Sequence, residues 1–217
     1  MTQTRRAAPE QVPNAYHAGN RQVQDRLDSR RLADRMRHSL AFSEDDRVFI
    51  EQCCLFFLAT ADAEGQPDVS YKGGLPGFVR VTGESTLAFP DYDGNGQFRS
   101  LGNILVNPRV GMIFMDFQDQ RRKRVKGEAS VRFDDQLLAE NPGAQAIVRV
   151  QATEIFGNCP RYIHKMELVA HSLYVPRADH MPPVPGWKLS EQYRDVLPQR
   201  DIQASSEAPA DEPRGSR

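Results

Sequence analysis

The segment Cys54-Leu-Phe-Phe-Leu-Ala-Thr60 is the strongest indication of the fold. It is a run of apolar and strand-favouring residues, far too short to cross a bilayer, and the turn-type cluster Asp62-Ala-Glu-Gly65 closes it. The segment Pro67–Lys72 follows after this turn. The sequence therefore predicts a β-hairpin, and it marks residue 53 as the start of β structure.

Short strands and small helices alternate along the chain after this hairpin. A helix is expected from Phe98 to Val106, where Asn107-Pro108 stops it, and residues 134–145 predict a short helix and loop. This alternation of short strands with small helices is typical of one α+β domain, mainly β, built on an antiparallel sheet or barrel. Further strands are expected at Phe78–Thr82, Thr86–Phe89, Val110–Phe117, Lys123–Phe133, Ala146–Phe156 and His164–Tyr174.

The flanks of the β region, residues 53–175, have a different composition. We expect residues 1–19 to be disordered and residues 20–52 to form N-terminal helices. Arg and Asp alternate between Asn20 and Leu40, which predicts a solvated helix with i,i+3 and i,i+4 ion pairs, and Ser43 with Asp46 predicts the capped start of a second helix. Residues 176–217 hold seven of the 15 prolines and predict an extension and tail without regular elements.

Composition excludes several classes of protein. Lys plus Arg is 28 and Asp plus Glu is 29, so a net charge of −1 disfavours a dedicated nucleic-acid binder. No apolar stretch follows Arg5 and Arg6, and no membrane-spanning run occurs, which favours a cytoplasmic protein. Three cysteines without a Cys-x-x-Cys pair predict reduced thiols and no metal site. The sequence motifs of serine hydrolases, zinc proteases and P-loop enzymes are absent from it.

The loop Gly94-Asn95-Gly96-Gln-Phe-Arg99 is the best candidate for an anion site. It resembles a dinucleotide-binding fingerprint, with Asp116 farther on, but Arg99 stands where the third glycine belongs and the following helix is short. Glycines still let backbone N–H groups approach an anion, and the helix that follows directs its N-terminus there. Arg99 and Ser100 in its first turn favour a bound phosphate over the alternative of an exposed loop arginine.

Two further clusters are candidate sites. Arg121-Arg-Lys-Arg-Val-Lys126 alternates so that Arg122, Arg124 and Lys126 share one face, which fits an interface, a solvated edge strand or a nucleic-acid backbone contact. Gly157-Asn-Cys-Pro-Arg161-Tyr162 pairs a cation with an aromatic ring, which suits an anionic aromatic ligand, although a simple turn has the same composition.

The order of these motifs resembles the pyridoxamine 5′-phosphate oxidase-like family of split-barrel proteins that bind flavin mononucleotide (FMN). The resemblance covers about residues 50–165. It rests on the order and spacing of six segments: Phe56-Phe-Leu-Ala-Thr60, Pro67-Asp-Val-Ser-Tyr-Lys72, Leu87-Ala-Phe89, Arg99-Ser100 with the helix into Asn107-Pro-Arg109, the strand Val110–Phe117, and Arg124-Val-Lys-Gly127. The turn Asn158-Cys-Pro-Arg-Tyr162 resembles one found in an uncharacterised bacterial branch of the family.

The family's fold implies a six-stranded antiparallel split β-barrel with small flanking helices, dimerised with FMN between the subunits. By the same resemblance Lys72 contacts the flavin, Arg99 and Ser100 hold its phosphate, and Arg122 and Arg124 reach it from the partner subunit. Asn95 and Gly96 of the glycine loop complete the predicted cofactor site.

Three departures argue against vitamin B6 oxidation. Pro67 stands where the true oxidases have an arginine, Phe89-Pro90 replaces a hydroxyl residue, and their C-terminal Arg and His have no counterpart. We therefore expect a homodimeric FMN-dependent oxidoreductase acting on an unidentified small molecule, with Arg161, Tyr162 and Trp187 lining the substrate pocket. The alternative is a non-catalytic carrier or sensor of flavin, deazaflavin F420 or haem.

Overall fold

The computed structural model describes residues 15–177, 180, 182–193 and 195–202. The chain divides into two compact units, Met1–Leu168 and Val169–Arg217. The disorder predicted for residues 1–19 falls largely outside the described residues, and so does the predicted tail from residue 204 onward. Helix α1 already begins at Ala18, inside the segment expected to be disordered.

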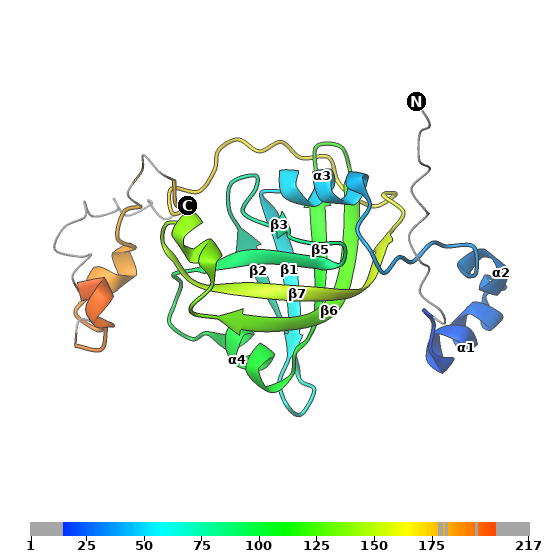
Figure 1. Ribbon diagram of the computed structural model, residues 1–217, viewed down its shortest axis with the longest axis horizontal. Coiled ribbons are helices and arrows are strands. Elements are labelled where there is room, and N and C mark those ends of the chain that lie inside the picture. Colours follow the sequence, from blue (N-terminus) through cyan, green and yellow to red (C-terminus); the bar gives the residue numbers. More distant parts are fainter. Residues whose placement is uncertain (1–14, 178–179, 181, 194, 203–217) are drawn as a thin grey trace. The chain divides into compact units, whose positions relative to one another are not determined.

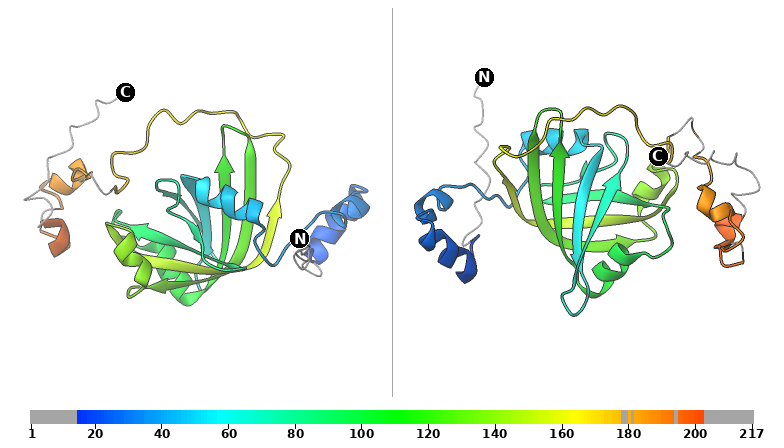
Figure 2. Two further views of the ribbon diagram at one scale, coloured as in Figure 1. Left: turned by 45° about the horizontal axis from the view of Figure 1, so that its top comes forward. Right: turned by 180° about the vertical axis from the view of Figure 1, so that it is seen from behind.

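The first unit is built on one antiparallel sheet that curls around its core (Figures 1 and 2). The mainly-β prediction is confirmed, but the sheet has seven strands where six were expected, because a two-residue strand, β3, lies at its edge. The sheet order is β2-β1-β5-β6-β7-β4-β3. The strands are β1 Leu55–Ala61, β2 Pro67–Gly73, β3 Arg80–Val81, β4 Thr86–Tyr92, β5 Arg109–Asp116, β6 Arg121–Arg132 and β7 Ala144–Gly157.

The predicted hairpin forms β1 and β2, with Leu55 opposite Gly73 and Ala61 opposite Pro67. Alternate residues of β1 point inward, so Phe56 and Leu58 are buried. The ring of Phe56 contacts the rings of Phe89 and Phe114, from β4 and β5. Aromatic packing inside the curled sheet thus joins strands that are not neighbours in the chain.

The sheet margins are β2 and β3, and the margin at β2 is joined to β4 through side chains. Lys72 Nζ of β2 lies 2.9 Å from Asp91 Oδ1 of β4. Helix α4, Arg99–Val106, follows β4, and its residue Ser100 contacts Ser70 of β2 with 3.0 Å between the hydroxyl oxygens. The polar groups of β2, β4 and α4 therefore gather at this split in the barrel.

Helix α3, Glu44–Gln52, confirms the predicted cap. The Ser43 hydroxyl accepts a hydrogen bond from the Asp46 amide, and the Asp46 carboxylate accepts one from the Ser43 amide. The same carboxylate pairs with Lys123 of β6. The capping box therefore fixes both the start of the helix and its attachment to the sheet.

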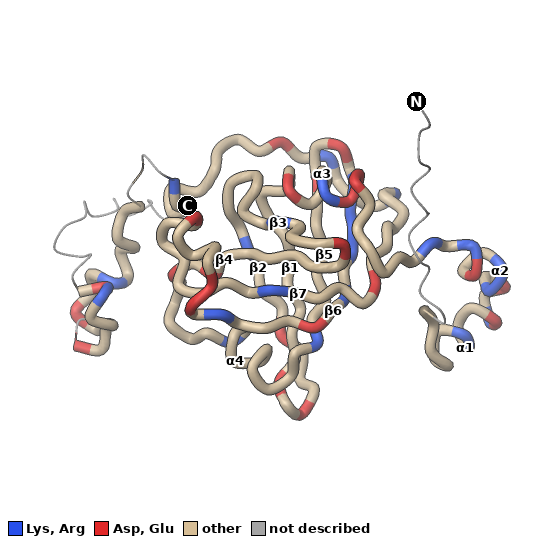
Figure 3. The backbone as a smooth tube through the Cα atoms, viewed as in Figure 1, with Lys and Arg blue, Asp and Glu red and all other residues tan. Residues whose placement is uncertain are grey.

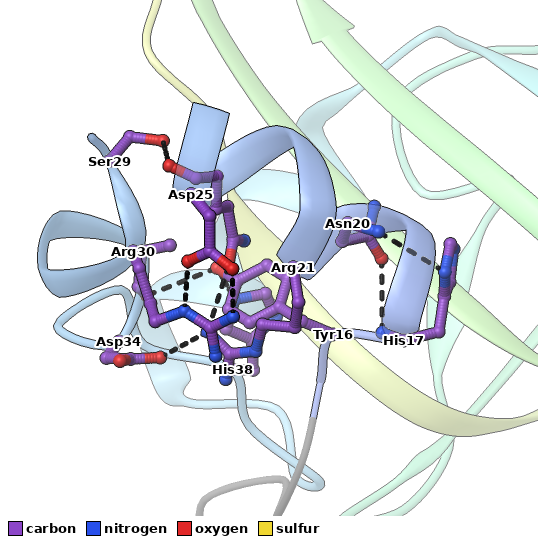
Figure 4. Close-up of polar contacts among 11 residues, drawn as sticks. Tyr16, His17, Asn20, Arg21, Asp25, Ser29, Arg30, Asp34 and His38 are labelled. Carbon is purple, nitrogen blue, oxygen red and sulfur yellow. Dashed lines mark hydrogen bonds and ion pairs between the residues drawn. The ribbon is translucent and has the colours of Figure 1, made fainter. Parts of the chain in front are cut away.

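The segment from Asn20 to Leu40 forms two short helices, not one. They are α1, Ala18–Arg26, and α2, Arg30–Ala33, and the chain turns between them at Asp28, whose φ is +50°. Basic and acidic residues are mixed along the whole segment (Figure 3). The close ion pairs join Arg21 to Asp34 and Arg30 to Asp25 across the turn, at spacings longer than the predicted i,i+3 and i,i+4 (Figure 4). Weaker i,i+4 attractions, Arg21 to Asp25 and Arg30 to Asp34, accompany them.

This N-terminal hairpin is joined to the barrel through His38. Its Nδ1 lies 2.6 Å from Glu154 Oε1 of β7. Its Nε2 lies 3.1 Å from the hydroxyl of Tyr16, which is labelled beside it in Figure 4. The His38 ring also packs on Phe156 at 4.9 Å between centroids. His38 and Glu154 are both buried, so the contact belongs to the interior of this unit.

The remaining predictions concern two helices, a last strand and the Pro-rich segment. Helix α4 and the short helix η1, Gln136–Glu140, lie where they were predicted. Residues 164–174 form no strand. The Pro-rich segment, expected to lack regular elements, contains the short 3-10 helix η2, Gly186–Leu189, and helical backbone at residues 199–202. Within the described residues no helix is both long and apolar enough to cross a membrane.

Candidate functional site

A cleft of about 270 Å³ lies between the end of β2, the end of β4 and the start of α4. Five of the predicted cofactor residues line it together: Lys72, Asn95, Gly96, Arg99 and Ser100. They come from a strand, a loop and a helix that the curl of the sheet brings to one place. The cleft also contains Asp68, Ser70, Asp91 and Tyr92.

The glycine loop has the geometry of an anion-binding turn. Gly96 has a φ of +74°, which favours glycine over other residues, and Asn95 Oδ1 accepts a hydrogen bond from the Gln97 amide. Around the Cβ positions of Gly94 and Gly96, no atom of the described chain lies within 4 Å. The backbone of the loop is therefore open on the side where a ligand would approach.

The start of α4 offers hydrogen-bond donors. Its N-cap residue is Phe98, with a φ of +47°, and among the described residues no side chain caps the helix. The first turn has no acidic residue, so its free N–H groups and the helix dipole favour an anion. Arg99 adds an exposed guanidinium and Ser100 a buried hydroxyl.

Two carboxylates of the cleft, Asp68 and Asp91, were not predicted from the sequence. Asp91 pairs with Lys72 at 2.9 Å, and Asp68 lies 3.8 Å from Arg99. Asp91 could have been identified from the sequence, because it directly follows the apolar run Leu87–Pro90. A carboxylate at the end of such a buried strand needs a partner. Burial also raises the pKa of Tyr92, so its hydroxyl stays protonated at neutral pH.

This donor set fits the phosphate group of FMN. A phosphate monoester is satisfied by backbone N–H groups at a helix start, an arginine fork and a hydroxyl, and the cleft supplies all three. Lys72 and Asp91 lie at the strand end of the same cleft, where they can meet the polar groups of a larger ligand. The residues present therefore match a phosphorylated cofactor.

Arg122 and Arg124 line a different hollow of the same protomer. This groove of about 340 Å³ lies over β1, β5 and β6, with an apolar floor that includes Phe57, Ala59 and Ile113. Arg122 donates to the Cys159 carbonyl at 2.9 Å. The alternation predicted for residues 121–126 is confirmed, but the edge-strand interpretation is wrong because β6 lies between β5 and β7.

The three residues predicted to line a substrate pocket belong to two different units of the chain. Arg161 and Tyr162 are exposed on the turn after β7, and neither lines the cleft or the groove. Trp187 belongs to the second unit, where its ring packs edge-on against Tyr193 at 5.5 Å between centroids. Their role as a pocket stays a prediction.

Comparison with protein families identifies the chain. The family model for pyridoxamine 5′-phosphate oxidase matches residues 42–159, which are 118 of the 217 residues. The chain belongs to this family. The match spans α3, the whole sheet and α4, so it includes both the cleft and the groove. No curated protein sequence matches the chain.

Several solved structures align with about half of the chain. A proposed pyridoxamine 5′-phosphate oxidase of Lactobacillus delbrueckii is 26% identical, covers 54% of this chain and 95% of its own, and has a TM-score of 0.44. HupZ of Group A Streptococcus is 21% identical, covers 54% and 93%, and has a TM-score of 0.43. The haem storage protein HutZ of Vibrio cholerae is 20% identical, covers 50% and 89%, and has a TM-score of 0.38.

Proposed function

We propose that this member of the pyridoxamine 5′-phosphate oxidase family is an FMN-binding oxidoreductase that acts on a small molecule. The observation that carries the proposal is the single cleft at the start of α4. Five residues predicted from the sequence line it together, and an uncapped helix start opens on it. FMN, when bound, supplies hydride transfer, and the protein supplies binding and orientation.

The phosphate end of the site is the start of α4. The exposed Arg99 side chain makes a long contact with Asp68, at 3.8 Å, so its guanidinium can turn to an arriving phosphate. Ser100 is held by Ser70 and can donate its own hydroxyl proton to the anion. The amides of the first turn of α4 complete the phosphate contacts.

The other end of the site is Lys72 on β2. Its ammonium is half-buried at the split of the barrel, and Asp91 fixes its direction. The ring system of the cofactor belongs at this end by the family resemblance, and Lys72 orients it there. We propose Arg161, Tyr162 and Trp187 as contacts of the small-molecule substrate, with no side chain yet assigned as acid or base.

A second copy of this chain is proposed to cover the groove over β1, β5 and β6. The floor of the groove is apolar, and Val69 on its rim is 66% exposed, which is a large exposure for a strand valine. Arg122 and Arg124 stand beside this apolar surface without a carboxylate partner among the described residues. In a homodimer these two arginines would contribute cations to the partner's FMN.

A visible absorption spectrum of the purified protein, followed by chromatography of the ligand that heating releases, tests the proposal. We expect about one FMN per subunit, and a particle of about 49 kDa, twice 24.5 kDa. A colourless protein that also fails to bind added FMN would overturn the proposed function. F420 and haem would then be the next ligands to test.

One observation favours the second candidate, a carrier or sensor that holds FMN without turnover. Both cations of the cleft already pair with carboxylates, and no histidine is among the residues that line it. Such a site can hold a ligand without supplying a free acid or base. Bound FMN that no reduced nicotinamide or deazaflavin donor reduces would support this candidate over the enzyme.

A further inference from the structure

Asp91 is a buried carboxylate at the ligand end of a core strand. Its side chain is 8% exposed, and Lys72, its partner at 2.9 Å, is 21% exposed. Phe89 and Leu87, two and four residues earlier on β4, are core residues, so the alternation of the strand turns Asp91 toward the interior. A carboxylate in this position is costly unless a cation accompanies it.

The backbone at Asp91 is irregular. The pairing of β4 with β7 shifts between Asp91 and Tyr92, so that Asp91 lies opposite Ala146 and Tyr92 opposite Ala144. A β-bulge of this kind redirects the side chains around it and is frequent beside functional sites. The bulge thus ends the regular pairing of β4 at the residue that contacts Lys72.

The two ion pairs of the cleft differ in strength. Arg99 and Asp68 are 3.8 Å apart, and their side chains are 69% and 25% exposed. Lys72 and Asp91 are closer and shielded from water, which strengthens their attraction. An arriving anion can therefore recruit Arg99 easily, whereas Lys72 stays with Asp91.

We propose that Asp91 is a positioning residue that holds Lys72 at the strand end of the cleft and cancels its charge. This inference rests on the proposed FMN site. A lone cation beside a flavin ring stabilises the anionic reduced flavin and so raises its reduction potential. With Asp91 in place the ring meets a neutral ion pair, and the bound flavin keeps a lower potential.

The matched variants are Asp91→Asn and Asp68→Asn, which each remove one carboxylate charge of the cleft. In Asp91→Asn we expect reduced FMN to bind about tenfold more tightly relative to oxidised FMN, a rise of about 30 mV for a two-electron couple. Asp68→Asn should leave the potential unchanged. The double variant Asp91→Asn with Lys72→Met should return the potential to the wild-type value, because neither charge is then present. An unchanged potential in Asp91→Asn would overturn the proposal.

A second measurement needs no FMN. The rate of acetylation of Lys72, read by peptide mass spectrometry in FMN-free protein, should rise several-fold in Asp91→Asn relative to exposed Lys165. An unchanged rate shows that Asp91 does not hold Lys72 and overturns the inference by itself. Wild-type protein that binds no FMN overturns the proposed function, while the acetylation rate still decides the Asp91–Lys72 relationship. Thermal unfolding of each variant confirms that it is folded.

Discussion

His38 Nδ1 lies 2.6 Å from Glu154 Oε1, and this contact places a residue of the N-terminal segment inside the barrel unit. Glu154 also accepts a hydrogen bond from Lys126 Nζ at 2.6 Å. Tyr16 extends the chain of polar contacts to the helical hairpin, where its hydroxyl donates to the Ala33 carbonyl. The attachment of the hairpin therefore depends on a few buried polar atoms.

Replacing His38 with alanine should lower the free energy of unfolding by about 3 kcal/mol, because a buried carboxylate loses a partner and a ring contact on Phe156 disappears. Tryptic cleavage after the hairpin arginines should become faster. Denaturant unfolding and timed proteolysis measure the two effects. The exposed His164 provides the control, and equal loss in His164→Ala would contradict the explanation.

Arg99→Glu should abolish retention of FMN and leave the fold intact, because Arg99 is 69% exposed and its side chain supports no core contact. Flavin content per subunit and a thermal melt check the two parts. Arg26→Glu makes the same charge change on α1 and should retain FMN. Unchanged FMN content in Arg99→Glu would remove the proposed phosphate site.

Gly127→Ala should destabilise the protein by roughly 3 kcal/mol or prevent its folding. A Cβ at Gly127 would lie 2.3 Å from the Gln151 carbonyl oxygen, at a bulge where β6 and β7 shift register. Gly111 on the neighbouring strand β5 is the control, since its Cβ would meet only Ala59 Cβ at 3.8 Å. Similar stability of the two variants would show that the strands adjust freely.

Ser43→Ala should cost about 1 kcal/mol of unfolding free energy, because it removes one half of the capping box of α3. Ser29 precedes α2 without capping it among the described residues, so Ser29→Ala should change stability by only a few tenths of a kcal/mol. Urea titrations of both variants measure the difference. A larger loss in Ser29→Ala would contradict the assignment of the caps.

Thiol reagents at pH 8 should modify Cys159 first and leave Cys53 intact. Cys159 is exposed, whereas burial, helped by the charge of Asp116, raises the pKa of Cys53 to about 12, so that it stays a thiol. The time course of labelling should lose its fast phase in Cys159→Ser. Rapid modification of Cys53, seen by mass spectrometry, would show that this part of the core opens readily.

Local features were predictable from the sequence because neighbouring residues determine them. The hairpin around Asp62–Gly65, the cap at Ser43 and the helix that begins at Arg99 each depend on a few consecutive residues. The same holds for the glycine loop, whose open backbone and helix start were expected from Gly94 and Gly96. Five residues that line the cleft could therefore be named from the sequence.

Contacts between distant residues were not predictable. Asp91 and Lys72 are 19 residues apart and meet only because the sheet curls, and His38 reaches Glu154 across 116 residues. The basic run of β6 suggested an edge strand, but pairing with β5 and β7 puts it in the middle of the sheet. The turn at Asp28 broke a helix whose charges alone favoured continuity.

The order of strands in the sheet has a consequence for folding kinetics. Strands β5, β6 and β7 are consecutive in the chain and adjacent in the sheet. The pairing of β1 with β5, in contrast, brings Phe56 opposite Phe114, which is far away in the sequence. Closing short loops costs less chain entropy than closing long ones, so we expect the meander from Arg109 to Gly157 to gain amide protection first. The β1–β2 hairpin is itself local, so it is its pairing with β5 that comes late, and the split of the barrel should be the last part to close.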